Sequence, residues 1–387
     1  MNSENSRKKL KIDRTVRQRV NRLSGGGAAG CFQCAMCSAV CDLSEGNTAF
    51  PRIQMQYAKL GLLDRIKADP AIWICHQCND CSVHCPRDAR PGDVMAGMRA
   101  LLISENSVFR TAGRLYENID RWWPVAVAVP VVFWFAFYLV LSGFSGFLAS
   151  DTPVRFEALV PHWMIYLVNI PVLAGALIAL GTSGSRAWSH WNVPESTLSM
   201  KLNAFIRSVT DILLHRKMTV CSAARQRSAG HMMVMWGFVG AAVTTLMIAL
   251  LLVFSSQTLP LPAVHPLKII GNAAGILVVA GGGFILLHRW RDARKMGRIT
   301  AFDAYFILLI LGVVATGFGA QFFRMYNQQS PALGVYLVHL GLVLSLFASL
   351  PFSKFSHMWY RLLAVTRLHL LSAEKPVRIP APISAND

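Results

Sequence analysis

The sequence predicts an all-α protein in two parts, a small helical domain followed by a bundle of six membrane-spanning helices. Eight of the nine cysteines fall in two runs within the first quarter of the chain. Beyond about residue 120, apolar stretches of about 20 residues recur, which is the length that crosses the hydrocarbon core of a bilayer. Hydrophobic residues make up 53% of the 387 residues and charged residues 15%, so the chain is unusually apolar for a soluble protein.

The apolar stretches give the order of the membrane helices. A long basic loop separates the first two stretches from the last four, which predicts a four-helix core with a two-helix addition. Six spans place both chain ends on one side of the membrane. The stretches run over about 124–148, 163–181, 233–254, 266–288, 302–322 and 333–352.

The basic residues indicate which side that is. The formal net charge of +18 would suggest nucleic acid in a soluble protein, but here Lys and Arg cluster in two connections, 183–230 and 289–300. The opposite connections hold little beyond Arg155, Lys268 and Arg324. Because cytoplasmic loops carry the excess of Lys and Arg, we expect both termini and the cysteine domain in the cytoplasm. The expected protein is a multi-pass inner-membrane protein with no nucleic-acid partner.

The chain outside the spans divides into three regions. Residues 1–30 form a basic segment that ends in three glycines, which we expect to be a flexible entry to the cysteine domain at 31–115. Within that domain, 51–60 and 94–107 carry apolar residues at helical spacing, which predicts a helical domain. The membrane domain spans 120–360, and 361–387 is expected to be a cytoplasmic tail.

The spacing within the two cysteine runs predicts two [4Fe–4S] clusters. In each run, three cysteines at x2 spacing wrap around one cluster, and the fourth ligates the other cluster. Zinc sites are the alternative, but they usually use paired Cys-x2-Cys units. Asp42 follows the first run where a proline follows the second. The expected ligand sets are Cys31, Cys34, Cys37 and Cys85 for one cluster, and Cys75, Cys78, Cys81 and Cys41 for the other.

Histidines near the membrane predict haem. His339 and His357 lie 18 residues apart, about five helical turns, so one helix would place them on the same face about 27 Å apart. Imidazole is a common axial ligand of haem iron, so two b haems are expected, one near each membrane face. His231, at the start of the third span, can face His357, and His288 is its competitor.

The outer haem has two candidate partners for His339. His265 and His162 lie at similar depth, and we favour His265 because it belongs to the four-helix core. The remaining cysteine, Cys221, stands alone in the basic loop and is expected to be an ordinary buried residue.

These motifs resemble known families. The run from Cys75 to Pro86, together with the first run, resembles the small iron–sulfur subunit of heterodisulfide reductases. Residues from about 228 to 360 resemble their cytochrome b subunit, which is similar to the respiratory nitrate reductase gamma subunit. His339 and His357 match that family's final helix, and His231 matches its facing helix. The family's second histidine there falls at Ala241, so the outer haem ligand departs from the pattern.

Both modules in one chain resemble the fused iron–sulfur and cytochrome b subunit of the quinone-interacting membrane-bound oxidoreductase complex. This resemblance implies flavin-containing partner subunits related to heterodisulfide reductase. It also implies electron exchange between menaquinone and adenylylsulfate reductase in sulfur metabolism. The alternatives are a heterodisulfide reductase-like or sulfite-reductase-linked complex, or a quinone-independent electron conduit.

Overall fold

A computed structural model describes most of the chain, and all its regular secondary structure in the described residues is helical, without strands. This confirms the predicted fold class. Cys221 and the end of the predicted tail lie outside the described residues. The structure describes residues 10–44, 49–148, 153–214, 224–254, 260–262, 264–292, 295 and 297–374.

The cysteine domain is a cluster of short helices around one long buried helix, α7 (Pro91–Asn106). Almost every residue of α7 is buried, and Met95, Met98 and Leu101 have no exposed surface. The cysteine-bearing loops pack around this helix, which positions both runs. The other elements are α1 (Arg14–Ser24), η1 (Gly27–Gly30), α2 (Met36–Ala39), α3 (Arg52–Leu60), α4 (Leu63–Lys67), α5 (Ala71–Ile74), α6 (Asp80–Val83) and α8 (Arg110–Glu117).

Within the basic N-terminal segment, residues 14–24 form helix α1. Asp13 caps α1 by accepting a hydrogen bond of 2.8 Å from the Thr15 backbone N–H, and Gly25 ends the helix with a φ of 73°. Val16 and Val20 are buried in the core of the cysteine domain. Residues 14–24 therefore belong to that domain.

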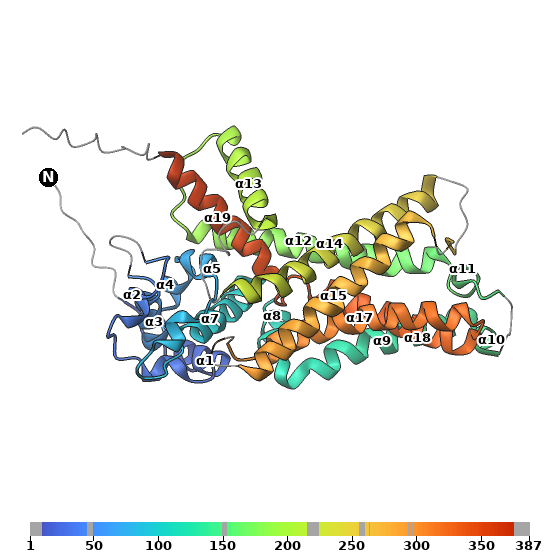
Figure 1. Ribbon diagram of the computed structural model, residues 1–387, viewed down its shortest axis with the longest axis horizontal. Coiled ribbons are helices and arrows are strands. Elements are labelled where there is room, and N and C mark those ends of the chain that lie inside the picture. The colour runs from blue at the N-terminus through green and yellow to red at the C-terminus, as the bar shows by residue number, and fades with distance from the viewer. Residues whose placement is uncertain are drawn as a thin grey trace, which may run out of the picture.

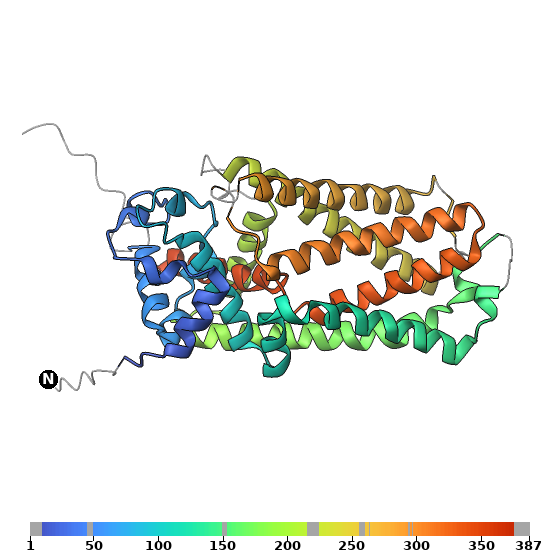
Figure 2. The same ribbon diagram turned by 90° about the horizontal axis from the view of Figure 1, so that it is seen from below.

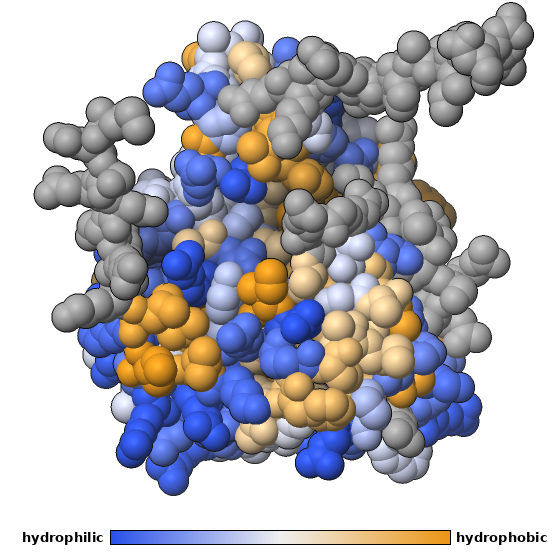
Figure 3. All heavy atoms as spheres, turned by 90° about the vertical axis from the view of Figure 1, so that its left-hand side faces the viewer, coloured by the Kyte–Doolittle hydropathy of each residue, from blue (hydrophilic) through white to orange (hydrophobic). Residues whose placement is uncertain are grey.

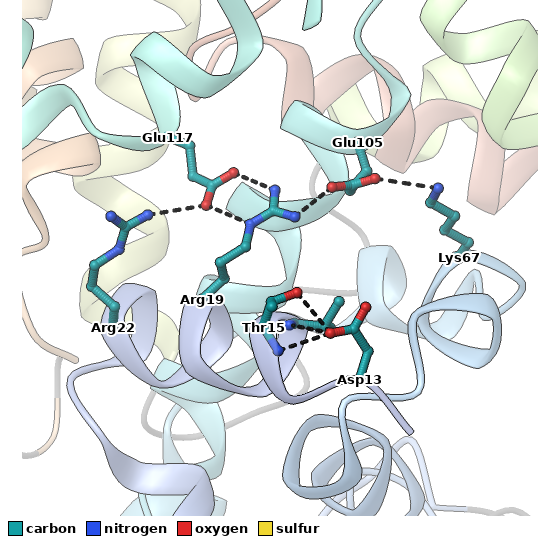
Figure 4. Close-up of polar contacts among 8 residues, drawn as sticks. Asp13, Thr15, Arg19, Arg22, Lys67, Glu105 and Glu117 are labelled. Carbon is teal, nitrogen blue, oxygen red and sulfur yellow. Dashed lines mark hydrogen bonds and ion pairs between the residues drawn. The ribbon is translucent and has the colours of Figure 1, made fainter. Parts of the chain in front are cut away.

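Ion pairs fix α1 to α7 and α8 within the cysteine domain (Figure 4). The Arg19 guanidinium donates to both carboxylate oxygens of Glu117, at 2.9 and 2.5 Å, and to Glu105 at 2.5 Å. Arg22 reaches Glu117 at 3.1 Å, and Lys67 lies 3.4 Å from Glu105. Because Glu117 ends α8 just before the first membrane helix, this network holds the segment that leads into the bundle.

Six helices are long and apolar enough to cross a membrane, as predicted. They lie side by side in an elongated bundle with the cysteine domain at one end (Figures 1 and 2). We call that end proximal and the opposite end distal. The helices are α9 (Ile119–Ser142), α12 (His162–His190), α14 (Ala224–Phe254), α15 (Pro266–Arg291), α17 (Ala301–Met325) and α18 (Gln329–Ser349).

Close backbone contact joins α14 and α15. A Cβ atom on Gly281 would lie 2.7 Å from the Gly230 carbonyl oxygen, and one on Gly237 would lie 2.7 Å from the Ala274 carbonyl oxygen. Small residues allow such an approach between membrane helices. This packing sets the position of His231, which follows Gly230 on α14.

The expectation that one continuous helix carries His339 and His357 is wrong. α18 ends at Ser349, and a separate helix, α19 (Ser356–Glu374), begins after a turn. In that turn, the Ser349 carbonyl accepts hydrogen bonds from the backbone N–H groups of Phe352, at 3.0 Å, and Ser353, at 2.8 Å. Pro351 lacks an N–H and cannot continue the α-helical ladder.

Helix α19 also includes the first residues of 361–387, the predicted tail. It packs against α5 and α7 of the cysteine domain and against α13 (Leu198–Leu213). The Tyr360 ring stacks on Trp73 with centroids 4.5 Å apart, and both side chains are buried. His357 is therefore held at the junction between the cysteine domain and the bundle. The short helices α10 (Ser145–Leu148) and α11 (Phe156–Leu159) lie at the distal end.

Candidate cofactor sites

The folded chain brings the eight cysteines together in the two sets of four expected from their spacing. Each set lines a small cavity of its own. Cys31, Cys34, Cys37 and Cys85 line the first, and Cys41, Cys75, Cys78 and Cys81 line the second.

The repeat in the cysteine runs extends to the backbone. Gln33 and Ala35 in the first run adopt left-handed conformations, and so do Gln77 and Asn79 at the matching positions of the second. These conformations turn the chain sharply between successive cysteines. Non-glycine residues rarely adopt them, because the left-handed region costs about 1–2 kcal/mol per residue.

A sulfur of each set accepts a backbone hydrogen bond. The Gln77 backbone N–H donates to Cys75 Sγ at 3.3 Å, and the Ala89 N–H donates to Cys85 Sγ at 3.3 Å. Such bonds tune the reduction potential of iron–sulfur clusters. Burial raises the pKa of the Cys41 and Cys78 thiols to about 11. These thiols therefore stay protonated at neutral pH until a bound metal displaces the proton.

The first set lies near the protein surface and the second lies deeper. Cys34 is exposed, whereas Cys75 and Cys81 are buried. Beside Cys34, the Phe32 and Met36 side chains are 57% and 45% exposed. Figure 3 views this end of the molecule and shows apolar patches among hydrophilic side chains. The first set is thus the more accessible to a partner.

A cavity of about 490 Å³ joins the second cysteine set to the proximal end of the bundle; we call it the proximal cavity. Cys75 and Cys78 line one side, and His231, His288 and His357 line the other. Most of the remaining lining comes from apolar side chains of α14, α15, α17 and α19. A mostly apolar cavity of this size with a few convergent polar groups suits a large planar cofactor.

His357 has the tautomer that a haem ligand requires. Its Nδ1 lies 2.7 Å from the Lys354 carbonyl oxygen, which can only accept, so Nδ1 carries the proton and Nε2 is bare. Burial lowers the pKa of His357 well below its ordinary value, which keeps the ring neutral. His288 bonds the Phe284 carbonyl in the same way, at 2.9 Å. His288 therefore stays a competitor of His231.

Three charged side chains, two of them buried, hold the segment before His357. Asp303, at the start of α17, accepts a hydrogen bond of 2.7 Å from Arg289 at the end of α15, and Lys354 contacts its second oxygen. Arg289 and Asp303 are both buried. Spacing along the chain gives no sign of this contact, because Lys354 meets Asp303 only after the turn that follows α18.

A second cavity, of about 330 Å³, lies at the distal end; we call it the distal cavity. His339 and His162 both line it, together with Lys268 and Arg324. The His339 Nδ1 lies 2.9 Å from the Val313 carbonyl oxygen, so its Nε2 is also bare. The Cβ of any residue replacing Gly317 would lie 3.3 Å from the His339 ring, so the small residue makes room for it.

His265, the ligand favoured from sequence, is placed differently. It is not among the described residues that line the distal cavity. Its Nδ1 accepts a hydrogen bond of 3.3 Å from the Leu267 backbone N–H and caps α15. A neutral His265 therefore carries its proton on Nε2, unlike His339 and His357. The structure brings His162, not His265, together with His339.

Two known families match the two parts of this chain. The family described as Citrate utilization protein B matches residues 127–377, and the 4Fe-4S dicluster domain matches residues 27–89. The first match covers well over half of the chain. The chain belongs to the citrate utilization protein B family. The second match shows that the two cysteine runs form an iron–sulfur domain.

Individual relatives match one part or both. Citrate utilization protein B of Escherichia coli is 23% identical over 86% of this chain and 87% of its own length. A heterodisulfide reductase C-subunit-like protein of Archaeoglobus profundus is 30% identical over 26% of this chain. The C subunit of the H(2):CoB-CoM heterodisulfide,ferredoxin reductase of Methanothermobacter thermautotrophicus is 33% identical over 24%. The chain spans about half the length of these two reductase subunits, 55% and 50%. No solved structure matches.

The matched relatives indicate electron transfer. The chain carries an iron–sulfur domain like that of the heterodisulfide reductase C subunit, followed by a domain with six helices that could span a membrane. Such an iron–sulfur domain implies electron transfer.

Proposed function

We propose that this chain is the membrane subunit of a respiratory oxidoreductase complex that passes electrons between the quinone pool and a cytoplasmic flavin-containing partner. One observation carries the proposal. A single cavity has the second cysteine set on one side and His231 and His357 on the other. That cavity therefore borders both the second cysteine set and the membrane helices.

The proposed order of sites follows their position in the fold. The first set is exposed at Cys34 and faces the partner. The second set borders the proximal cavity, and the distal cavity lies at the far end of the bundle. Clusters and b haems would supply one-electron chemistry at these sites, while the chain fixes their spacing and environment. The excess of Lys and Arg in 183–230 and 289–300 supports a cytoplasmic proximal end.

The proposed ligands follow the same geometry. The two cysteine sets hold the two [4Fe–4S] clusters. His231 and His357 hold the proximal haem, for which His357 presents a bare Nε2 into the described cavity. His339 and His162 hold the distal haem, because His265 uses its Nδ1 to cap α15. Ala241 on α14 stands where the family pattern has a histidine. The second ligand of the distal haem would therefore come from α12 instead of α14.

The partner has two candidates. The resemblance to heterodisulfide reductase subunits supports a flavin-containing reductase related to that enzyme, with adenylylsulfate reductase beyond it. The match with Escherichia coli citrate utilization protein B, however, includes both modules and most of both chains. That observation favours an enzyme of citrate utilisation as the electron-exchanging partner. Co-purification of the tagged chain from its host, followed by mass spectrometry, distinguishes the two.

Anaerobic reduction by a menaquinol analogue tests the function. We expect the purified protein in detergent to show the absorbance of reduced b haem when the analogue is added, followed by reduction of the clusters seen by electron paramagnetic resonance (EPR). Protein whose haem is reduced by dithionite but not by the quinol would contradict quinone interaction. An extracytoplasmic cytochrome that reduces such protein would support the quinone-independent conduit.

A further inference from the structure

Two buried arginines lie between the second cysteine set and the proximal cavity. Arg99 comes from α7 and Arg361 from α19, and both line the cavity beside Cys75 and His357. Arg99 is 8% exposed. Neither has a role in the ligand sets described above. Sequence reasoning missed them because Arg99 sits within the apolar stretch 94–107 and Arg361 within the predicted tail.

Both guanidinium groups donate hydrogen bonds to the backbone that leads into the second cysteine run. Arg99 donates from Nε to the Ile72 carbonyl at 2.8 Å and from Nη2 to the Cys75 carbonyl at 2.5 Å. Arg361 donates from Nη1 to the same Cys75 carbonyl at 3.2 Å and to the Ile74 carbonyl at 3.1 Å. Its Nη2 lies 3.0 Å from His76 Nδ1. Both guanidinium groups thus donate to the same Cys75 carbonyl oxygen.

Within the part of the chain that the structure describes, no carboxylate pairs with either arginine, and the Cys75 sulfur is the negative group that acts on both. The ion pairs there include neither Arg99 nor Arg361. The carboxylate of Asp303, which also influences Arg99, is already held by Arg289 and Lys354. Burying an uncompensated charge is costly, and burying two like charges side by side is costlier. A cluster held by Cys75 would offset part of this charge, and an anion in the proximal cavity would offset more of it.

Arg99 keeps one terminal nitrogen outside these backbone hydrogen bonds. A guanidinium carries five N–H donors, and the bonds of Arg99 use its Nε and Nη2 but not its Nη1. Arginine recognises carboxylates through paired N–H bonds, which makes it suited to an anionic edge of a planar ligand. The cavity that these donors border is the one that holds His231 and His357.

We propose that Arg99 and Arg361 bind the propionate carboxylates of the proximal haem and thereby join the haem edge to the loop of the second cluster. This inference rests on the proposed function, because it requires a haem in the proximal cavity. The same side chains would contact the haem carboxylates and the Cys75 carbonyl. Their positive charge would stabilise the reduced form of the haem, so removing either charge lowers the haem reduction potential.

The test compares full-length variants in detergent. Arg361→Gln and Arg99→Gln each remove one positive charge. Arg361→Lys keeps the charge but loses the paired N–H donors of the guanidinium. Arg367→Gln is the matched control. Arg367 lies on the same helix but donates to the Asn192 carbonyl, away from the cavity. Haem content, the optical midpoint potential of each haem and the EPR signals of the reduced clusters are measured for every variant.

We expect both Gln variants to retain less proximal haem. The haem that remains should have an equilibrium constant for reduction about tenfold lower, a shift of about 59 mV for one electron. Arg361→Lys should recover most of the potential, and Arg367→Gln should match wild type. If a Gln variant does not fold, Arg361→Lys with intact cluster signals is compared with wild type instead. Its proximal haem should bind more weakly than that of wild type.

Two results would overturn the proposal in distinguishable ways. Unchanged haem content and potential, with shifted cluster potentials, would show that the arginines serve the cluster alone, while the proposed function stands. Wild-type protein with complete clusters but no b haem would overturn both the arginine proposal and the proposed function.

Discussion

The carboxylate of Asp303 lies 2.7 Å from the guanidinium of Arg289, and both side chains are buried at the proximal end of the bundle. Lys354 contacts the second oxygen of the same carboxylate. One acid therefore links the end of α15, the start of α17 and the turn that leads to His357. This contact connects the packing of the membrane helices to the geometry of the proximal cavity.

Replacing that acid should be strongly destabilising. Asp303→Asn leaves Arg289 buried without a full counter-charge, which typically costs about 3–5 kcal/mol. We expect a lower thermal unfolding midpoint, measured by tryptophan fluorescence in detergent, and a loss of proximal haem. The control is Asp292→Asn, whose partner Lys295 is 74% exposed, so its effect should stay below about 1 kcal/mol. Equal effects of the two substitutions would contradict a structural role for the Asp303 contact.

The ion network of Figure 4 predicts a second stability effect. Arg19→Ala removes three hydrogen bonds to Glu105 and Glu117, and the Glu117 side chain is only 2% exposed. Hydrogen bonds to charged groups contribute about 1.5–3 kcal/mol, so α1 should loosen from the cysteine domain. Hydrogen exchange of 14–24 should quicken in this variant. Arg17→Ala, at an exposed position of the same helix, should leave exchange unchanged.

Helix α15 offers a matched pair of glycines. A Cβ on Gly281 would lie 2.8 Å from the Met233 Cβ, whereas one on Gly283 would meet nothing within 4 Å. Gly281→Ala should force α14 away next to His231, at a cost of about 1–3 kcal/mol, and weaken haem binding in the proximal cavity. Gly283→Ala should be neutral. Similar thermal midpoints and haem contents for the two variants would show that α14 and α15 do not pack this closely.

The distal cavity predicts different outcomes for two histidines. His162 lines the cavity with His339, whereas His265 caps α15 through its Nδ1. We expect His162→Ala to lose the distal haem and His265→Ala to retain it with a small loss of stability, about 1 kcal/mol for a helix cap. Pyridine haemochrome spectra count the haem in each variant. Loss of haem from His265→Ala alone would restore the ligand that the sequence favoured.

Much of the architecture could be predicted because it depends on local patterns. The six apolar stretches predict the six helices, since length and hydropathy decide membrane insertion, and cysteine spacing predicts the two four-thiol sets. The spacing argument for His339 and His357 failed because it assumed one helix. Pro351 and the turn at Ser349 end that helix, yet the turn still delivers His357 to the proximal cavity.

The features that the sequence did not reveal depend on contacts between distant segments. Arg361 meets the backbone of Cys75 only because α19 folds back onto the cysteine domain. The choice between His162 and His265 depends on which ring lines the cavity with His339 and on the hydrogen bond through which His265 caps α15. Spacing along the chain carries no information about either. Expected depth in the membrane is similar for both, and membership of the four-helix core favours His265.

The haem content of wild-type protein and of His357→Ala tests the central claim most directly. The claim is that the proximal cavity holds a b haem beside the second iron–sulfur cluster. We predict b haem in the wild-type protein, loss of the proximal haem in His357→Ala, and cluster EPR signals that are present in both. A wild-type protein with full cluster iron and no b-haem spectrum, or a variant with unchanged haem content, would contradict the claim.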